Sequence, residues 1–180
     1  MAGLDELRAL VERARGHDPD AWEELYVRSY PRLHDYARRR VPTREEADDA
    51  VSEAVARAYA GIGRFRWRGG GFDAWMYGIL RNVILETHRR RVRHVSGFEP
   101  AGEEPGPIDY VLAREEGAAL RAAFARLGAE DQEVLELRVV GGLNAKQIAS
   151  VLGKRAGAVR MSQSRALARL RALMVEGEHA

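Results

Sequence analysis

The 180-residue sequence contains no cysteine, which excludes disulfide bonds, thiolate chemistry and sulfur-ligated zinc or iron–sulfur sites. No stretch approaches the roughly 18 consecutive apolar residues that a membrane-spanning helix needs. The N-terminus lacks the basic and then apolar order of a secretory signal peptide. These absences predict a soluble, cytoplasmic protein without a membrane segment of its own. Hydrophobic residues make up 46% of the chain, so it has enough apolar material for a core.

Acidic residues are absent between positions 137 and 175, where eight basic residues lie. Residues 61–95 are also basic, with eight basic and two acidic residues, whereas residues 96–136 carry ten acids and three bases. A uniformly solvated surface would mix the two signs. Two basic blocks divided by an acidic one therefore indicate two contact surfaces for a polyanion, with ordinary solvated helix faces as the alternative.

The sequence predicts an all-α fold of two small helical domains. Alanine, leucine, arginine and glutamate dominate, and alternating β-branched runs are missing. Three prolines, three glycines and three glutamates lie between Gly97 and Pro107, a composition that disfavours both helix and core burial. We therefore expect a helical domain over residues 1–95, a flexible linker over residues 96–117 and a second helical domain over residues 118–180.

Two helices are expected in the first domain before its basic block. The first spans about Asp20 to Arg40, with Pro31 as a possible kink and with these apolar anchors: Trp22, Leu25, Tyr26, Leu33 and Tyr36. The second starts at Thr43, whose hydroxyl can cap it and with which Glu46 would complete a capping box. It ends near Gly61 and carries one buried stripe of apolar residues: Ala47, Ala50, Val51, Ala54, Val55, Ala58 and Tyr59.

On the opposite face of this second helix, Glu46, Asp49 and Glu53 form an acidic stripe. Such a stripe suits a protein partner, or it is only the solvated side of an amphipathic helix. Carboxylates that bind a metal are a poorer interpretation, because no histidine lies nearby in sequence to complete a site.

Arginine alternates with aromatic residues in the segment Arg64–Arg68, and a run of glycines then opens a helix. Arginines attract phosphate, aromatic rings offer stacking faces and glycines let the backbone approach closely. One face of the helix carries Met76, Leu80, Val83 and Thr87, and another carries Trp75, Ile79, Asn82, Glu86, Arg89, Arg90 and Arg93. The second face suits unpaired bases. The alternative is that Trp75 and Ile79 belong to the core and that the arginines are a solvated helix end.

A helix-turn-helix is predicted in the C-terminal domain. A helix from Glu130 to Val140 is followed by a Gly141-Gly142 break, and Asn144 then caps a short helix. Gly153 supplies the turn into a longer helix from about Ala156 to Val175. The expected inward residues of the two helices are Ile148, Ala149, Leu152, Val159, Ala166, Leu167 and Leu170. The second helix of such a motif fits the major groove of DNA, although a basic surface helix in a bundle would have the same pattern.

Together these segments resemble the bacterial sigma factors, in particular the small extracytoplasmic-function class. The segment Glu46–Glu53 is similar to the acidic motif with which that family binds core polymerase, although Ser52 stands where a glutamine is usual. The segment Phe72–Asn82 resembles its promoter-melting helix, and the segment Leu120–Leu173 resembles its C-terminal DNA-binding region. The resemblance covers roughly residues 20–95 and 118–175.

The resemblance implies a sigma factor that binds core RNA polymerase, recognises the −10 and −35 elements of a promoter and helps to open it. Its implied partners are the β′ clamp helices and β subunit of the polymerase, promoter DNA and an anti-sigma factor. The core polymerase-binding residues would be Glu46, Asp49, Ser52 and Glu53. The −10 element would be bound by Arg64, Arg66, Trp67, Arg68, Trp75, Ile79, Asn82, Arg89 and Arg90, and the −35 element by Lys154, Arg155, Arg160, Met161, Ser164 and Arg165.

Glu86 departs from the polar amide that the family sometimes has at that position. Met161 is apolar where a small polar residue is common, so it contacts a thymine methyl group or fills space. Arg165 is the best candidate for a guanine or phosphate contact.

Two other functions stay open at this stage. A simple DNA-binding regulator would use only the helix-turn-helix and would leave the acidic stripe and the aromatic loop without a partner. An enzyme is disfavoured, because the sequence has no Ser/His/Asp set, no phosphate-binding loop and no metal-ligand spacing, and its five histidines are scattered. We therefore expect no catalysis, no cofactor and no bound metal.

Overall fold

The structure is a computed structural model, and it describes residues 2–94 and 115–177. These residues form α-helices and one short 3₁₀ helix, without any strand, so the predicted all-α fold is confirmed. Most of the predicted linker lies outside the described residues. Within the described part of the chain, none of the helices has the length and apolar character needed to span a bilayer.

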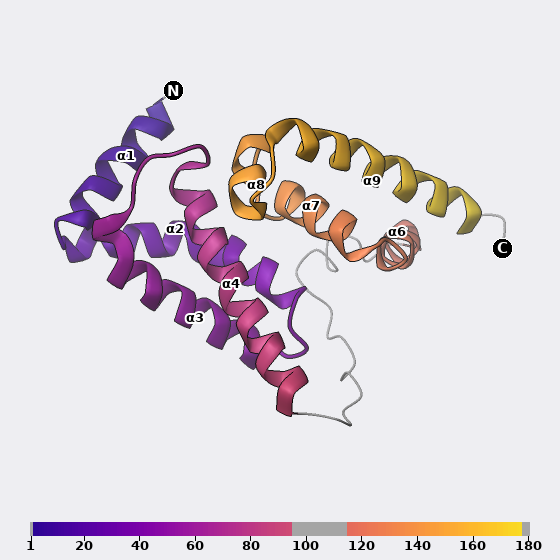
Figure 1. The fold of residues 1–180 in the computed structure, drawn as a ribbon, viewed down its shortest axis with the longest axis horizontal. Coiled ribbons are helices and arrows are strands. Elements are labelled where there is room, and N and C mark those ends of the chain that lie inside the picture. The colour runs from indigo at the N-terminus through magenta and orange to yellow at the C-terminus, as the bar shows by residue number, and fades with distance from the viewer. Residues whose placement is uncertain (1, 95–114, 178–180) are drawn as a thin grey trace.

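Four helices make up the N-terminal group in Figure 1: α1 (Ala2–Arg15), α2 (Pro19–Arg38), α3 (Arg44–Gly61) and α4 (Gly71–His94). A 3₁₀ helix, Ile62–Arg64, and an irregular stretch connect α3 to α4. Helix α1 was missed by the sequence analysis, although its signal was present. Its buried residues Leu7, Leu10, Val11 and Ala14 fall at the three- and four-residue spacing of an amphipathic helix.

Helix α2 begins one residue earlier than predicted and continues through Pro31. The Asp18 carboxylate caps it by accepting the backbone N–H groups of Asp20 and Ala21, at 3.1 and 3.2 Å. Leu25, Leu33 and Tyr36 are buried as expected, and Trp22 is partly buried against the core. The prediction for Tyr26 was wrong, because its side chain lies at the edge of α2 with 39% exposed.

Helix α3 begins as predicted, with the Thr43 hydroxyl accepting the backbone N–H of Glu46 at 3.2 Å. The expected capping box is not completed, because the Glu46 carboxylate pairs with Arg91 of α4 instead. Alanines on the buried face let α2 and α4 pack closely on α3: Ala47, Ala50, Ala54 and Ala58. Tyr59 was placed wrongly in that stripe, since it is 48% exposed at the end of the helix.

The C-terminal group contains α6 (Glu115–Ala125), α7 (Ala129–Val139), α8 (Ala145–Leu152) and α9 (Ala156–Gly177). Asn144 and Gln147 form a full capping box at the start of α8, and Gly153 ends that helix at φ 64°, a conformation that glycine adopts without strain. The helix-turn-helix is therefore confirmed. Val159 and Ala166 of α9 are buried as predicted, whereas Leu167 was wrong, being 42% exposed.

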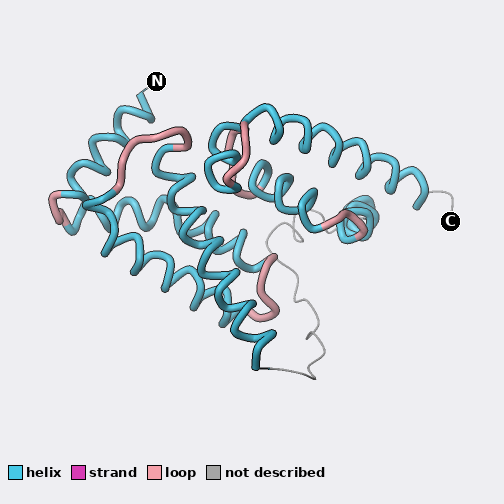
Figure 2. The backbone as a smooth tube through the Cα atoms, viewed as in Figure 1, coloured by secondary structure: helices cyan, strands magenta, loops and turns pink. Residues whose placement is uncertain are grey.

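The two groups of helices share one core. Figures 1 and 2 show α8 lying against α4, and the main cluster of buried residues runs from α1–α4 into the C-terminal group. The contributions from that group are Leu137, Leu143, Ile148, Ala149 and Val159. A smaller cluster of Leu127, Leu135 and Ala166 holds α7 and α9 together beside α6. No pattern in the sequence indicated that the two groups pack on each other.

Candidate nucleic-acid and polymerase interface

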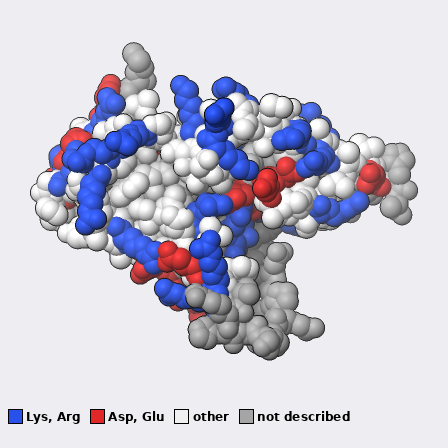
Figure 3. All heavy atoms as spheres, in the orientation of Figure 1, with Lys and Arg blue, Asp and Glu red and all other residues white. Residues whose placement is uncertain are grey.

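The predicted −35 residues lie on one exposed face of the helix-turn-helix. Buried Val159 and Ala166 turn the opposite face of α9 outward, and Met161 is 64% exposed there. The six residues exposed in this way are Lys154, Arg155, Arg160, Met161, Ser164 and Arg165. Figure 3 shows basic side chains gathered over α8 and α9.

The cations of this face differ in their partners. Lys154 Nζ lies 3.3 Å from Glu130 Oε2 of α7, and Arg169, further along α9, pairs with Asp131. Arg155, Arg160 and Arg165 make no ion pair with any residue that the structure describes. These three guanidinium groups, two on α9 and one directly before it, carry the same charge, and a phosphate backbone would relieve their mutual repulsion.

In the loop over residues 65–70, some side chains are buried and others are exposed. Phe65, which the sequence analysis treated as a stacking face, is buried, and its ring lies against Trp67, Phe72 and Trp75 at centroid distances of 5.1, 5.9 and 5.1 Å. Trp67 is half-buried, whereas the neighbouring arginines are exposed. Arg66 bends back and donates to the carbonyl oxygen of Phe65 at 2.9 Å. The loop is therefore built on an aromatic cluster.

Along the predicted −10 face of α4, the exposure of the side chains increases from Trp75 toward the end of the helix. Trp75 and Ile79 are half-buried and pack against the core, which the alternative interpretation had anticipated in part. Asn82 is exposed, as are Arg89 and Arg90 near the end of the helix. Helical spacing therefore puts two half-buried apolar side chains, one amide and two arginines on one side of α4, and Trp75 at the start of that side contacts Phe65 of the loop over residues 65–70.

Glu86 is held by α3. Arg57 donates to its two carboxylate oxygens at 3.1 and 2.9 Å and also bonds Glu53 at 2.7 Å. These hydrogen bonds lower the pKa of Glu86 and keep its carboxylate ionised. Glu86, which departs from the polar amide that the family sometimes has there, therefore links α4 to α3.

The four predicted polymerase contacts do not form one uniform acidic stripe. Asp49 and Ser52 are exposed on α3, and Glu53 is exposed although it pairs with Arg57. The Glu46 carboxylate is only 27% exposed and pairs with Arg91, so it faces α4 rather than solvent. The surface open to a partner is therefore narrower than the sequence predicted.

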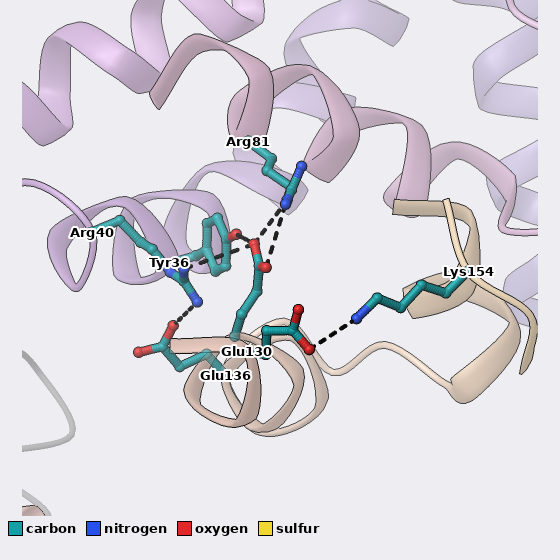
Figure 4. A network of polar contacts seen from close by, with 7 residues as sticks. Tyr36, Arg40, Arg81, Glu130, Glu136 and Lys154 are labelled. Carbon is teal, nitrogen blue, oxygen red and sulfur yellow. Dashed lines mark hydrogen bonds and ion pairs between the residues drawn. The ribbon is translucent and has the colours of Figure 1, made fainter. Parts of the chain in front are cut away.

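A polar network that the sequence did not reveal joins the two groups of helices. Arg81 Nε of α4 lies 2.8 Å from Glu133 Oε1 of α7, and Arg40 pairs with buried Glu136 one turn further along (Figure 4). The Tyr36 hydroxyl donates to Glu133 at 3.4 Å. Burial raises the pKa of Glu136, and Arg40 opposes that shift. No signal short of the tertiary structure pairs these distant positions.

No described group of histidines, aspartates or glutamates has the geometry of a metal site. A cavity of about 290 Å³ lies beside the polar network, lined by Arg28, Ser29, Arg32, Asp73, Tyr77 and Gly141 among others. It contains neither a paired acid and base nor a nucleophile next to a base. The residues that the sequence predicts to bind core polymerase or DNA thus lie on α3, on α4 and α9, and on the segments that directly precede these two helices.

Comparison with known proteins identifies this arrangement. The family model for Sigma-70 region 2 matches residues 25–94, and the model for Sigma-70, region 4 matches residues 117–170. The ECF RNA polymerase sigma factor SigD of Mycobacterium tuberculosis is 32% identical over 188 residues, covering 98% of this chain and 88% of SigD. The chain belongs to the extracytoplasmic-function (ECF) sigma factors. The ECF RNA polymerase sigma factor BldN of Streptomyces coelicolor is 35% identical over 170 residues.

The BldN match covers 92% of this sigma factor but 64% of BldN, slightly under two thirds of that protein's length. Among solved structures, CnrH in complex with the cytosolic domain of CnrY has a TM-score of 0.70 at 24% identity, covering 94% of this chain and 97% of CnrH. The sigma factor RpoE in complex with the anti-sigma factor NepR from Bartonella quintana has a TM-score of 0.63 at 22% identity. Both confirm the fold. Family membership assigns this sigma factor to promoter-specific transcription initiation by RNA polymerase.

Proposed function

We propose that this sigma factor reads a promoter at two places while it is bound to core RNA polymerase. The face of α9 contacts the −35 element as a duplex. The loop over residues 65–70 and the adjoining face of α4 hold unpaired bases of the −10 element. The observation that carries the proposal is the exposed set Arg155, Arg160 and Arg165, which has no ion-pair partner among the described residues and is available to an anion.

The two proposed sites differ in the form of DNA that they suit. A regular helix with exposed cations and a polar tip fits the major groove of a duplex. At the other site, half-buried Trp75 and Ile79 beside exposed Asn82 offer stacking and hydrogen bonding at a short distance from arginines. An extruded base loses a few kcal/mol of stacking, and such a surface offsets that loss.

Core polymerase is proposed to bind the exposed part of α3, through Asp49, Ser52 and Glu53. Glu46 does not belong to this exposed surface, because its ion pair with Arg91 joins α3 to α4. An anti-sigma factor is proposed as a further partner, because RpoE has a similar fold and is described in complex with one. We also propose that the protein acts in the cytoplasm, where RNA polymerase is found, and that it is not an enzyme.

The assignment of α4 to promoter opening is tested by Trp75→Ala in run-off transcription with purified core polymerase. We expect opening, measured by permanganate reactivity of −10 thymines, to fall by about tenfold, since base stacking on an aromatic ring contributes roughly 1–3 kcal/mol. Binding to a closed duplex that contains only the −35 element should not change. Equal losses in both measurements would contradict the assignment of this helix to melting.

The polymerase surface is tested by the double substitution Asp49→Lys and Glu53→Lys. We expect affinity for core polymerase to fall by at least about tenfold, because both carboxylates are exposed and like charges placed against a complementary surface cost several kcal/mol. The matched control is Glu23→Lys and Glu24→Lys, which makes the same change of charge on exposed positions of α2. Normal binding of core by the α3 variant would show that the acidic residues are only solvated surface.

A further inference from the structure

The loop over residues 65–70 is held from one side by α1. Trp67 Nε1 donates to Glu12 Oε1 at 3.2 Å, and the Arg8 guanidinium lies over the indole ring, 5.3 Å from its centroid. Phe65 contacts the ring edge-on, and Gly71 lies beside it with φ 68°, a backbone conformation that residues with a side chain rarely adopt. One hydrogen bond, one cation–π contact and one aromatic contact thus fix the orientation of an otherwise half-exposed side chain.

We propose that Arg8 and Glu12 are positioning residues for −10 recognition, acting through Trp67. This inference rests on the proposed function of the loop. A side chain that binds an unpaired base loses less conformational entropy if the free protein already holds it in place. The helix that the sequence analysis overlooked therefore has a part in DNA recognition without touching DNA.

The test compares Glu12→Ala with Glu12→Gln in holoenzyme binding to a fork-junction promoter whose −10 strand is unpaired. We expect the alanine variant to bind about fivefold more weakly and the glutamine variant to bind as the parent does, since its amide oxygen still accepts the indole N–H. Arg15→Ala is the control, because it removes the bond to the other oxygen of Glu12, at 2.7 Å, and leaves in place the oxygen that accepts the indole N–H.

Trp67→Ala separates the failure of this inference from the failure of the proposed function, because it removes the stacking face as well as the indole N–H. If Trp67→Ala leaves fork-junction binding unchanged, the proposed role of the loop is wrong. If Trp67→Ala weakens binding while Glu12→Ala does not, only the positioning role is wrong. Glu12→Ala should add nothing in the Trp67→Ala background, and an additive loss there would overturn the inference as well.

Discussion

The arginines of α4 and α9 give the same signal in the sequence but have different surroundings in the structure. On α4, Arg81 pairs with Glu133 and Arg91 pairs with Glu46, so these charges join helices to one another. On α9, Arg160 and Arg165 have no ion-pair partner among the described residues. Clustered arginines therefore have two different roles in this chain. Those that face acidic residues stabilise the packing of helices, and those that face solvent are available to bind phosphate.

The first way to sharpen this contrast is to remove both free arginines of α9. Arg160→Ala with Arg165→Ala should weaken binding to a −35 duplex by about 10- to 100-fold and reduce the slope of log affinity against log salt by about 2. The melting temperature should hardly change. Arg171→Ala, an exposed arginine further along α9, is the control and should have a smaller effect. A large loss of thermal stability in the double variant would show that these arginines stabilise helix packing, as Arg81 and Arg91 of α4 do.

The second prediction concerns Arg57, which links α3 and α4, and expects a loss of thermal stability without a loss of DNA binding. Arg57→Ala removes the hydrogen bonds to Glu53 and Glu86, so the melting temperature should fall by a few degrees. Binding to a −35 duplex should stay as in the parent. Thermal unfolding and anisotropy titration of the same preparation test both statements. Unchanged thermal stability would mean that the pairs are too solvated to matter.

The smallest expected effect is the pH dependence of the Glu86 pair. Arg57 lowers the pKa of Glu86 below the ordinary value of 4.5, so its contribution to stability is present above that pH and is lost as pH falls through the native pKa. We expect Glu86→Gln to flatten the decrease in melting temperature below about pH 4.5. In the Arg57→Ala background the same substitution should leave the curve unchanged, and a persisting difference there would assign the effect to another partner.

Much of the local structure could be predicted, because short-range chemistry determines it. Asn144 and Gly153 define the ends of α8 by capping and by a positive φ, whatever surrounds them. Burial at the rims of helices was predicted less well. Tyr26, Tyr59 and Leu167 have apolar character and helical spacing, but whether a rim position is covered depends on which helix packs beside it.

The residues of the candidate site could be predicted from the sequence, but the ion-pair partners of those residues could not. The exposed set on α9 follows from helical periodicity, which places Arg160 and Arg165 opposite Val159 and Ala166. The ion pairs of Glu46 and Glu86 could not be predicted, because each carboxylate pairs with an arginine on another helix. The burial of Gly70 depends on the same long-range packing, since a Cβ there would lie 3.0 Å from Ser150 Cβ of α8.

The sequence by itself determined the helices, their caps, the segregation of charge and the family, because each of these depends on residues near one another in the chain. Only the tertiary structure decided which charges are free and which surfaces are covered. Arg40 and Glu136 are 96 residues apart in the chain, and Arg81 and Glu133 are 52 apart, whereas an ion pair depends on distance in space. The contacts between the two groups of helices therefore come from the packing of distant parts of the chain.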